Sequence, residues 1–168
     1  MTITIRKALP EDALKLTTIH DACWQSAYSG IIPHEYLMDR ISRQEQRVIN
    51  IKNFLADPNC GMYCVEINNK IIGRLAFAKC EDSDKQKAGE IGSIYLLEEF
   101  WNKGYGKEML DFALTNLRNM EFNEIILWVL EENTRARKFY EKHGFVLDGA
   151  NRELNYGRTL NSLRYIHI

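Results

Sequence analysis

The chain has 168 residues, of which 45% are hydrophobic and 27% are charged, and its formal net charge is -1. This length and composition are typical of one globular domain with a buried core, so we expect a single domain over residues 1–168. Because the chain has 22 basic and 23 acidic residues, no overall positive field would attract nucleic acid or an anionic membrane. An anion-binding site must therefore be local.

The sequence predicts neither export nor membrane insertion. No apolar segment follows the first charged residues as in a secretory leader, and no run of 18 apolar residues occurs, so we expect a cytoplasmic protein. Cys23, Cys60, Cys64 and Cys80 form no CxxC pair and no zinc spacing with the histidines. We therefore expect reduced, buried thiols and no metal site.

The first third of the chain predicts one strand and two helices. Alternating apolar residues predict a strand over residues 2–7. Apolar residues at helical spacing then predict a helix that ends at Gly30. Ser42 and Glu45 form a capping-box pattern that predicts the start of a second helix. Residues 28–37, between the two helices, carry no predicted element.

The middle of the chain predicts a hairpin followed by a strand, a glycine loop and a helix. Residues 61–67 and 70–80 have the pattern of two strands, joined at 68–69 by asparagines that tolerate the positive φ of a two-residue turn. A fourth strand is predicted over 90–97. Apolar residues on one helical face predict a helix over 105–120.

The last third predicts a strand, a short helix and a final strand pair. Residues 124–130 alternate little, which is typical of a strand covered on both faces. A helix follows over 133–144, and turn residues at 155–158 separate the last two strands. The resulting order, β-α-α-β-β-β-α-β-α-β-β, predicts an α/β fold of the α+β kind. Its sheet would be mixed and mostly antiparallel, with about seven strands and helices on both faces.

The loop before the helix at 105–120 has the features of an anion site. A helix that follows a glycine loop presents unpaired N–H groups and the positive end of its dipole. Gly104 and Gly106 would let a phosphate approach the backbone, and Lys103 and Lys107 add positive charge. The alternative is a plain turn with two solvated lysines.

Two common phosphate-binding loops do not fit this stretch. A P-loop requires glycine where Trp101 stands and serine or threonine where Glu108 stands. A dinucleotide-binding loop requires a small residue in place of Met109 and lies early in a parallel βαβ unit. A nucleotide-binding domain that uses this loop is therefore the weakest of the functional hypotheses.

The stretch Trp101-Asn102-Lys103-Gly104-Tyr105-Gly106 resembles the phosphate loop of the GNAT N-acetyltransferase superfamily. The pattern of that loop is Arg or Gln, two residues, Gly, one residue, then Gly or Ala, and Trp101 departs from it at the first position. Residues 128–145 resemble the second acetyl-CoA segment of the family. The matching residues of this segment are Asn133, Ala136, Phe139, Tyr140, Gly144 and Phe145.

The resemblance implies a GNAT-like fold whose fourth and fifth strands splay apart, with acetyl-CoA in the gap. It implies that the backbone of residues 102–107 binds the pyrophosphate and that Ile94 and Leu96 pair with the pantetheine arm. Asn133 would bond the pantetheine or cap its own helix, and both alternatives stay open. The cofactor-binding residues implied by the resemblance are Ile94, Tyr95, Leu96, Trp101, Asn102, Lys103, Gly104, Tyr105, Gly106, Lys107, Asn133, Ala136, Phe139 and Tyr140.

The resemblance also implies direct transfer of an acetyl group to a primary amine of a small molecule or peptide. Glu90 matches the position of the general base in the histone-acetylating branch of the family, and Tyr140 would lie near the sulfur. On a regular strand, Glu90 would share a face with Ile94 and Leu96. The alternatives are a solvated Glu90, with water and backbone carbonyls as the base, and a Tyr140 that only packs in the core.

Trp24, Tyr28 and Tyr36 lie in the region expected to form the substrate wall, where aromatic rings can hold a cation or a flat group. The alternative is that these rings only pack on the sheet. The four histidines have no paired spacing, so we expect each to be structural or exposed. A non-catalytic acyl-CoA-binding regulatory module is the main alternative function, and a homodimer is compatible with either.

Overall fold

The computed structural model describes residues 2–57 and 59–168, and these form one seven-stranded sheet with helices. The strand order is β1-β2-β3-β4-β5-β7-β6, and neighbouring strands are antiparallel except for β4 and β5. The predicted mixed, mostly antiparallel sheet is confirmed. The elements are β1 Thr4–Lys7, η1 Pro10–Asp12, α1 Ala13–Tyr28, α2 His34–Ser42, α3 Gln44–Leu55, β2 Met62–Ile67, β3 Lys70–Lys79, β4 Gly89–Leu96, η2 Glu98–Phe100, α4 Tyr105–Asn119, β5 Ile125–Leu130, α5 Thr134–Lys142, β6 Val146–Asn155 and β7 Thr159–His167.

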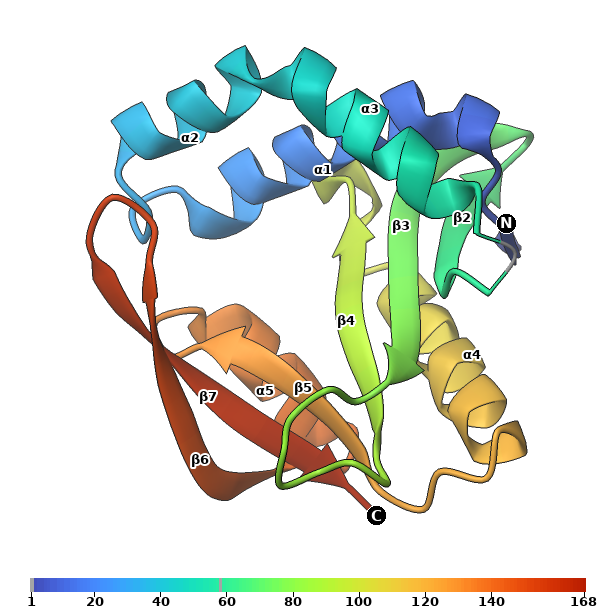
Figure 1. Ribbon diagram of the computed structural model, residues 1–168, viewed down its shortest axis with the longest axis vertical. Coiled ribbons are helices and arrows are strands. Elements are labelled where there is room, and N and C mark those ends of the chain that lie inside the picture. Colours follow the sequence, from blue (N-terminus) through green and yellow to red (C-terminus); the bar gives the residue numbers. More distant parts are fainter. Residues whose placement is uncertain (1, 58) are drawn as a thin grey trace.

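Helices cover both faces of the sheet, as predicted (Figure 1). On one face, Leu16 of α1 and Leu55 of α3 pack in a buried cluster with Cys64 of β2. On the other face, α4 buries Met109 and Leu117 completely against β3, β4 and β5. The helices α1, α3 and α4 therefore each contribute an apolar stripe to the core. Within the described ranges, no helix combines the length and the apolar character needed to cross a bilayer.

The hairpin between β2 and β3 follows the sequence prediction. Asn68 and Asn69 have φ values of 49° and 61°, so both adopt the left-handed conformation that a tight two-residue turn requires. The pairing of Ile67 with Lys70 closes the turn. The turn pairs β3 with β2, and β4 lies on the other side of β3.

The helices between β1 and β2 differ from the prediction. The structure has a helix, α2, that was not predicted, and Ser42 ends it instead of capping the next one. The hydroxyl of Ser42 donates to the carbonyl of Asp39 at 2.6 Å, and α3 begins at Gln44. α2 has nine residues and only Leu37 among them is buried, so little apolar burial distinguishes it from a loop.

The two parallel strands diverge soon after they begin. β4 and β5 pair only at Gly89 with Ile125 and at Glu90 with Ile126. Beyond these pairs, β4 continues along β3 and β5 continues along β7, and Figure 1 shows the two strands separating. The edge of β4 over residues 91–96 therefore has no strand partner on the β5 side among the described residues.

The four cysteines are buried and free, as expected. Burial raises the pKa of the Cys23 and Cys64 thiols to about 12. Both thiols therefore remain protonated at neutral pH, and neither is an activated nucleophile.

Candidate active site

The loop between η2 and α4 presents a row of unpaired backbone donors. The N–H groups of residues 102–106 make no hydrogen bond to any described residue, whereas the N–H of Lys107 donates to the carbonyl of Gly104 at 3.0 Å. Asn102 and Gly104 have φ values of 58° and 89°, which curve the loop. Successive amides in such a concave turn form an anion-binding nest at the positive end of the helix dipole.

The two glycines of this loop differ in how well they would tolerate a side chain. Gly104 is left-handed, so a side chain there would be strained even though a Cβ would meet nothing within 4 Å. A Cβ on Gly106 would lie 3.5 Å from the ring of Phe139, an ordinary contact. The two lysines also differ, because Lys107 forms an ion pair with Asp111 and Lys103 pairs with no carboxylate in the described part of the chain.

Trp101, which departs from the loop pattern of the GNAT superfamily, connects the loop to both sides of the gap. Its Nε1 donates to the carbonyl of Leu96 at the end of β4, at 2.7 Å. On the α5 side, the guanidinium carbon of Arg135 lies 3.1 Å from the centroid of the indole ring. A guanidinium is thus present beside the loop even though the loop itself carries no arginine or glutamine.

Asn133 caps α5. Its Oδ1 accepts a hydrogen bond from the N–H of Ala136 at 3.1 Å. Of the two roles that the sequence left open for Asn133, the capping of its own helix is therefore present.

Replacing Asn133 by alanine is expected to lower the free energy of unfolding by about 1 kcal/mol, because an N–H at the start of α5 loses its acceptor. Asn133→Asp keeps an acceptor at this position and is the matched control, with stability close to that of the wild type. Urea unfolding followed by circular dichroism measures both. An equal loss in the two variants would mean that the cap contributes nothing.

Tyr140 of α5 has a hydroxyl that is available as a donor. Its ring contacts those of Phe139 and Phe145, with centroid distances of 5.2 and 5.6 Å. The hydroxyl makes no hydrogen bond to a described residue, and burial, together with the nearby hydroxyl of Tyr95, raises the pKa of Tyr140. The phenol therefore keeps its proton over the whole physiological pH range.

Glu90 belongs to the last parallel pair, where β4 and β5 begin to separate. Burial raises the pKa of its carboxyl group, and Asp82 and Glu81 raise it further, while Arg152 opposes them. These neighbours come from the loop after β3 and from β6. A carboxyl group with a raised pKa is closer to the range that suits a general base at neutral pH.

β4 is not a regular strand, which changes the face on which Glu90 lies. Ile91 is opposite Phe77 and Ser93 is opposite Ala76, so Gly92 is an extra residue in the ladder. Ile91 and Ile94 consequently pack in the same core under α4. The alternation expected for a regular strand is broken by this bulge, and Glu90 does not share a face with Ile94.

The predicted substrate residues gather in one cluster of rings, here called the aromatic wall: Trp24, Tyr28, Tyr36, Tyr95 and Tyr156. Trp24 Nε1 donates to the Tyr95 hydroxyl at 3.0 Å, and the Tyr28 hydroxyl lies 3.1 Å from the same oxygen. Burial raises the pKa of Tyr28, and Tyr95 and the Tyr140 hydroxyl also contribute. The wall thus lies within electrostatic range of the α5 tyrosine.

The structure also brings together residues that the sequence did not indicate. His20 of α1 accepts hydrogen bonds from Arg40 of α2 and Arg74 of β3, at 3.1 and 3.0 Å. The ring of His20 lies 4.8 Å from that of Tyr95, so this group adjoins the aromatic wall. The one available signal was Arg74, a charged residue within the apolar run of β3.

Comparison with known proteins is consistent with this geometry. A model described as the acetyltransferase (GNAT) family matches residues 16–145. A probable N-acetyltransferase from Mycobacterium tuberculosis is 30% identical over 148 residues, which cover 88% of this chain and 82% of the relative.

Two solved structures are similar over almost the whole chain. The PaiA N-acetyltransferase from Thermoplasma acidophilum, in complex with coenzyme A, has a TM-score of 0.80 at 22% identity and covers 99% of both chains. YncA from Salmonella typhimurium, with its cofactor acetyl-CoA, has a TM-score of 0.67 at 16% identity and covers 99% of this chain and 93% of its own. Similarity at these identities shows a shared fold.

Proposed function

Since the chain belongs to the GNAT family of acetyltransferases, we propose that it transfers the acetyl group of acetyl-CoA directly to a primary amine of a small molecule or peptide. The observation that carries this proposal is the row of unpaired amides at residues 102–106, which adjoins the gap between β4 and β5. Relatives of the same fold with coenzyme A or acetyl-CoA bound support it.

The residues around the gap fit acetyl-CoA. The nest formed by residues 102–106 would accept the pyrophosphate, with Lys103 as the nearest cation that has no carboxylate partner among the described residues. The free edge of β4, from Ile94 to Leu96, would pair with the pantetheine amides as a strand does. Ala136 and Phe139 of α5 would line the opposite side.

The reaction requires a neutral amine and a stabilised thiolate. An amine with a pKa of about 10.4 is neutral about once in 10³ to 10⁴ at pH 7, which costs about 4 to 5 kcal/mol unless a base removes the proton. Glu90 is our candidate for that base. The amine nitrogen would attack the thioester carbonyl, its proton would pass to the base, and the C–S bond would break.

Tyr140 would act as a hydrogen-bond donor to the departing sulfur. Full proton transfer from an ordinary tyrosine, with a pKa of about 10, to a thiolate with a pKa of about 8.5 is uphill by about 2 kcal/mol. Burial raises the pKa of Tyr140 further, which makes full transfer still less favourable. A hydrogen bond that strengthens as charge develops on sulfur is therefore the role that fits this residue.

A non-catalytic acyl-CoA-binding module is the alternative, and Trp101 is the observation that favours it. Its indole N–H donates to the Leu96 carbonyl, and a tryptophan at this position offers no charged side chain to the pyrophosphate. Such a protein would bind acetyl-CoA without releasing its thiol.

Thiol release from acetyl-CoA distinguishes the two functions. The purified protein is incubated with acetyl-CoA and a panel of polyamines, aminoglycosides, amino acids and short peptides, and hydrolysis without amine is subtracted. Release that depends on an amine is expected. Tight binding of acetyl-CoA in calorimetry, with no release from any amine, would favour the binding module instead.

Glu90→Gln is expected to lower kcat about 10²-fold and to flatten the fall of activity at acidic pH. The wild-type rate should fall as the pH drops through the raised pKa of the carboxyl group, because a protonated base cannot accept the amine proton. Initial rates from pH 5 to 9 measure this. The exposed Glu153→Gln on β6 is the control and should keep the wild-type profile.

The same variant carries a prediction about stability with a defined sign. Since the pKa of Glu90 is raised in the folded state, its favourable contribution is present at low pH and is lost as the pH rises through that pKa. Glu90→Gln should therefore have a higher Tm than the wild type at pH 8 and a similar Tm at pH 4. A changed Tm with an unchanged rate profile would exclude Glu90 as the base.

A further inference from the structure

His20, Arg40 and Arg74, here called the arginine cluster, are not used by the reaction described above. The Nδ1 atom of His20 lies 3.1 Å from Arg40 Nη2 and 3.0 Å from Arg74 Nη1. Because a guanidinium only donates, Nδ1 must accept both bonds, and the ring carries its proton on Nε2. Burial and the neighbouring arginines lower the pKa of His20, so the ring is neutral.

The region around the cluster has more positive than negative charge. Asp21 forms an ion pair with Arg47, and its carboxylate lies 3.5 Å from Arg40 Nε. Arg74 forms no ion pair in the described part of the chain. Three guanidinium charges minus one carboxylate charge leave a net charge of +2.

Arg74 is the most unusual member of the cluster. It is only 7% exposed, and burial lowers its pKa to about 10. A buried cation without a counterion is unfavourable, and the normal compensation is an anion with hydrogen bonds in good geometry.

Two buried polar atoms near the cluster, Arg74 Nε and Ser93 Oγ, have no hydrogen-bond partner among the described residues. Arg40 Nε makes no hydrogen bond either, although the Asp21 carboxylate lies 3.5 Å from it. Ser93 lies opposite Ala76, two residues before Tyr95 on the same face of β4. Buried polar atoms without partners are rare in proteins, so these atoms leave hydrogen-bonding capacity for a polar ligand or an ordered water.

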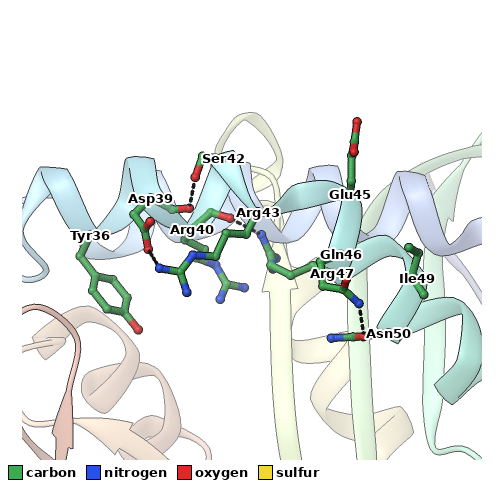
Figure 2. Close-up of a pocket in the computed structure, with 10 residues that line it drawn as sticks. All are labelled: Tyr36, Asp39, Arg40, Ser42, Arg43, Glu45, Gln46, Arg47, Ile49 and Asn50. Atoms are coloured by element: carbon green, nitrogen blue, oxygen red, sulfur yellow. Dashed lines mark hydrogen bonds and ion pairs between the residues drawn. The ribbon is translucent and has the colours of Figure 1, made fainter.

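Arg40 is the member of the cluster that lines a surface hollow. A surface hollow of about 590 Å³ lies along α2 and α3, and Figure 2 shows Arg40 and Arg47 directed into the same region between Tyr36 and Asn50. On the sheet side, the Arg40 guanidinium carbon lies 3.9 Å from the Trp24 ring centroid. Arg40 therefore contacts both the hollow and Trp24 of the aromatic wall.

We propose that the arginine cluster binds a carboxylate of the acceptor, which makes the acceptor an amino acid or an amino-acid-like amine. The proposal rests on the proposed function, since it assigns the second substrate of that reaction. The Nε–Nη edge of a guanidinium presents two parallel donors that match the two oxygens of a carboxylate. The carboxylate would be held by Arg40 and Arg74 while the amine points along the aromatic wall toward Tyr140.

Pairs of probes that differ only at the carboxylate test this inference. In the rate measurement, each of glycine, alanine, glutamate and phenylalanine is compared with its carboxamide by thiol release. We expect kcat/KM to be at least tenfold higher for each accepted acid than for its amide. In the binding measurement, the N-acetyl amino acids and their amides are compared by thermal shift in the presence of CoA, which needs no acetyl transfer.

Variants connect this preference to the cluster. Arg74→Met and Arg40→Met should each abolish the difference in kcat/KM between acid and amide. Arg74→Lys should keep part of that difference, because lysine keeps the charge but lacks the two parallel N–H donors of a guanidinium. Arg43→Met is the matched control. Arg43 lines the same hollow, but its side chain is 70% exposed and pairs with Asp39, so the acid preference should persist.

The outcomes separate the inference from the function on which it rests. Transfer to amines without any preference for the acid, or a preference that persists in both methionine variants, would overturn the carboxylate site and leave the acetyltransferase intact. Absence of transfer to every amine would contradict the proposed function, and the thermal shifts would still decide the site. Equal shifts for acids and amides, or none, would overturn it.

Discussion

Tyr140→Phe is expected to lower kcat for acetyl transfer about 10²-fold and to leave the Kd for acetyl-CoA within about twofold of the wild type. The reason is that the phenol of Tyr140 has no hydrogen-bond partner in the described structure and keeps its proton, because burial raises its pKa. Its interaction with sulfur would become strong only as the thiolate develops. Steady-state thiol release gives kcat, and calorimetry gives the Kd.

A matched tyrosine elsewhere controls for the loss of a hydroxyl. Tyr63 of β2 is also partly buried, stacks on Phe77 with a centroid distance of 4.9 Å, and has a raised pKa because of burial. Tyr63→Phe should change neither kcat nor Kd. An unchanged kcat in Tyr140→Phe would remove this residue from the mechanism, and a large rise in Kd would make it a binding residue instead.

The parts of the fold that were predicted correctly are those with local signals. Asn68 and Asn69 favour the left-handed turn conformation by themselves, without help from distant residues. The hairpin and its two strands were therefore predictable. Met109 and Leu117 repeat at helical spacing on α4, and the glycine loop before them marks its start. In each case a few consecutive residues contain the necessary information.

The parts that were not predicted depend on contacts between distant residues. α2 has one buried residue, Leu37, which packs in the same cluster as the aromatic wall. The bulge at Gly92 exists only in relation to the ladder with β3. Single-sequence patterns contain neither kind of information.

The arginine cluster, our proposed carboxylate site, shows the same limit. His20, Arg40 and Arg74 come from α1, α2 and β3, and no spacing in the sequence relates them. By contrast, the glycine loop is contiguous, so an anion site could be hypothesised there before the geometry of its unpaired amides was known. A site assembled from several elements requires the sheet order and the helix packing first.

Gly104→Ala is expected to weaken acetyl-CoA binding about 10- to 100-fold, or about 1.4 to 2.7 kcal/mol, with a much smaller change in kcat at saturation. Gly104 has φ of 89°, where a Cβ costs about 1–2 kcal/mol. A methyl group that stays there would hold the pyrophosphate off the backbone amides. A loop that relaxes to avoid the strain would no longer direct the amides of residues 102–106 to one point.

The control for this variant must have the same strain at a site outside the loop of unpaired amides. Gly149 of β6 has φ of 91°, and a Cβ there would meet nothing within 4 Å, as at Gly104. Gly149→Ala should therefore lower the Tm by a similar amount and leave the Kd for acetyl-CoA unchanged, because only the Gly104 variant alters the unpaired amides. Calorimetric Kd values and scanning calorimetry on both variants measure this. Equal losses of Tm with an unchanged Kd in Gly104→Ala would mean that the pyrophosphate binds elsewhere, since strain alone would then account for the whole effect.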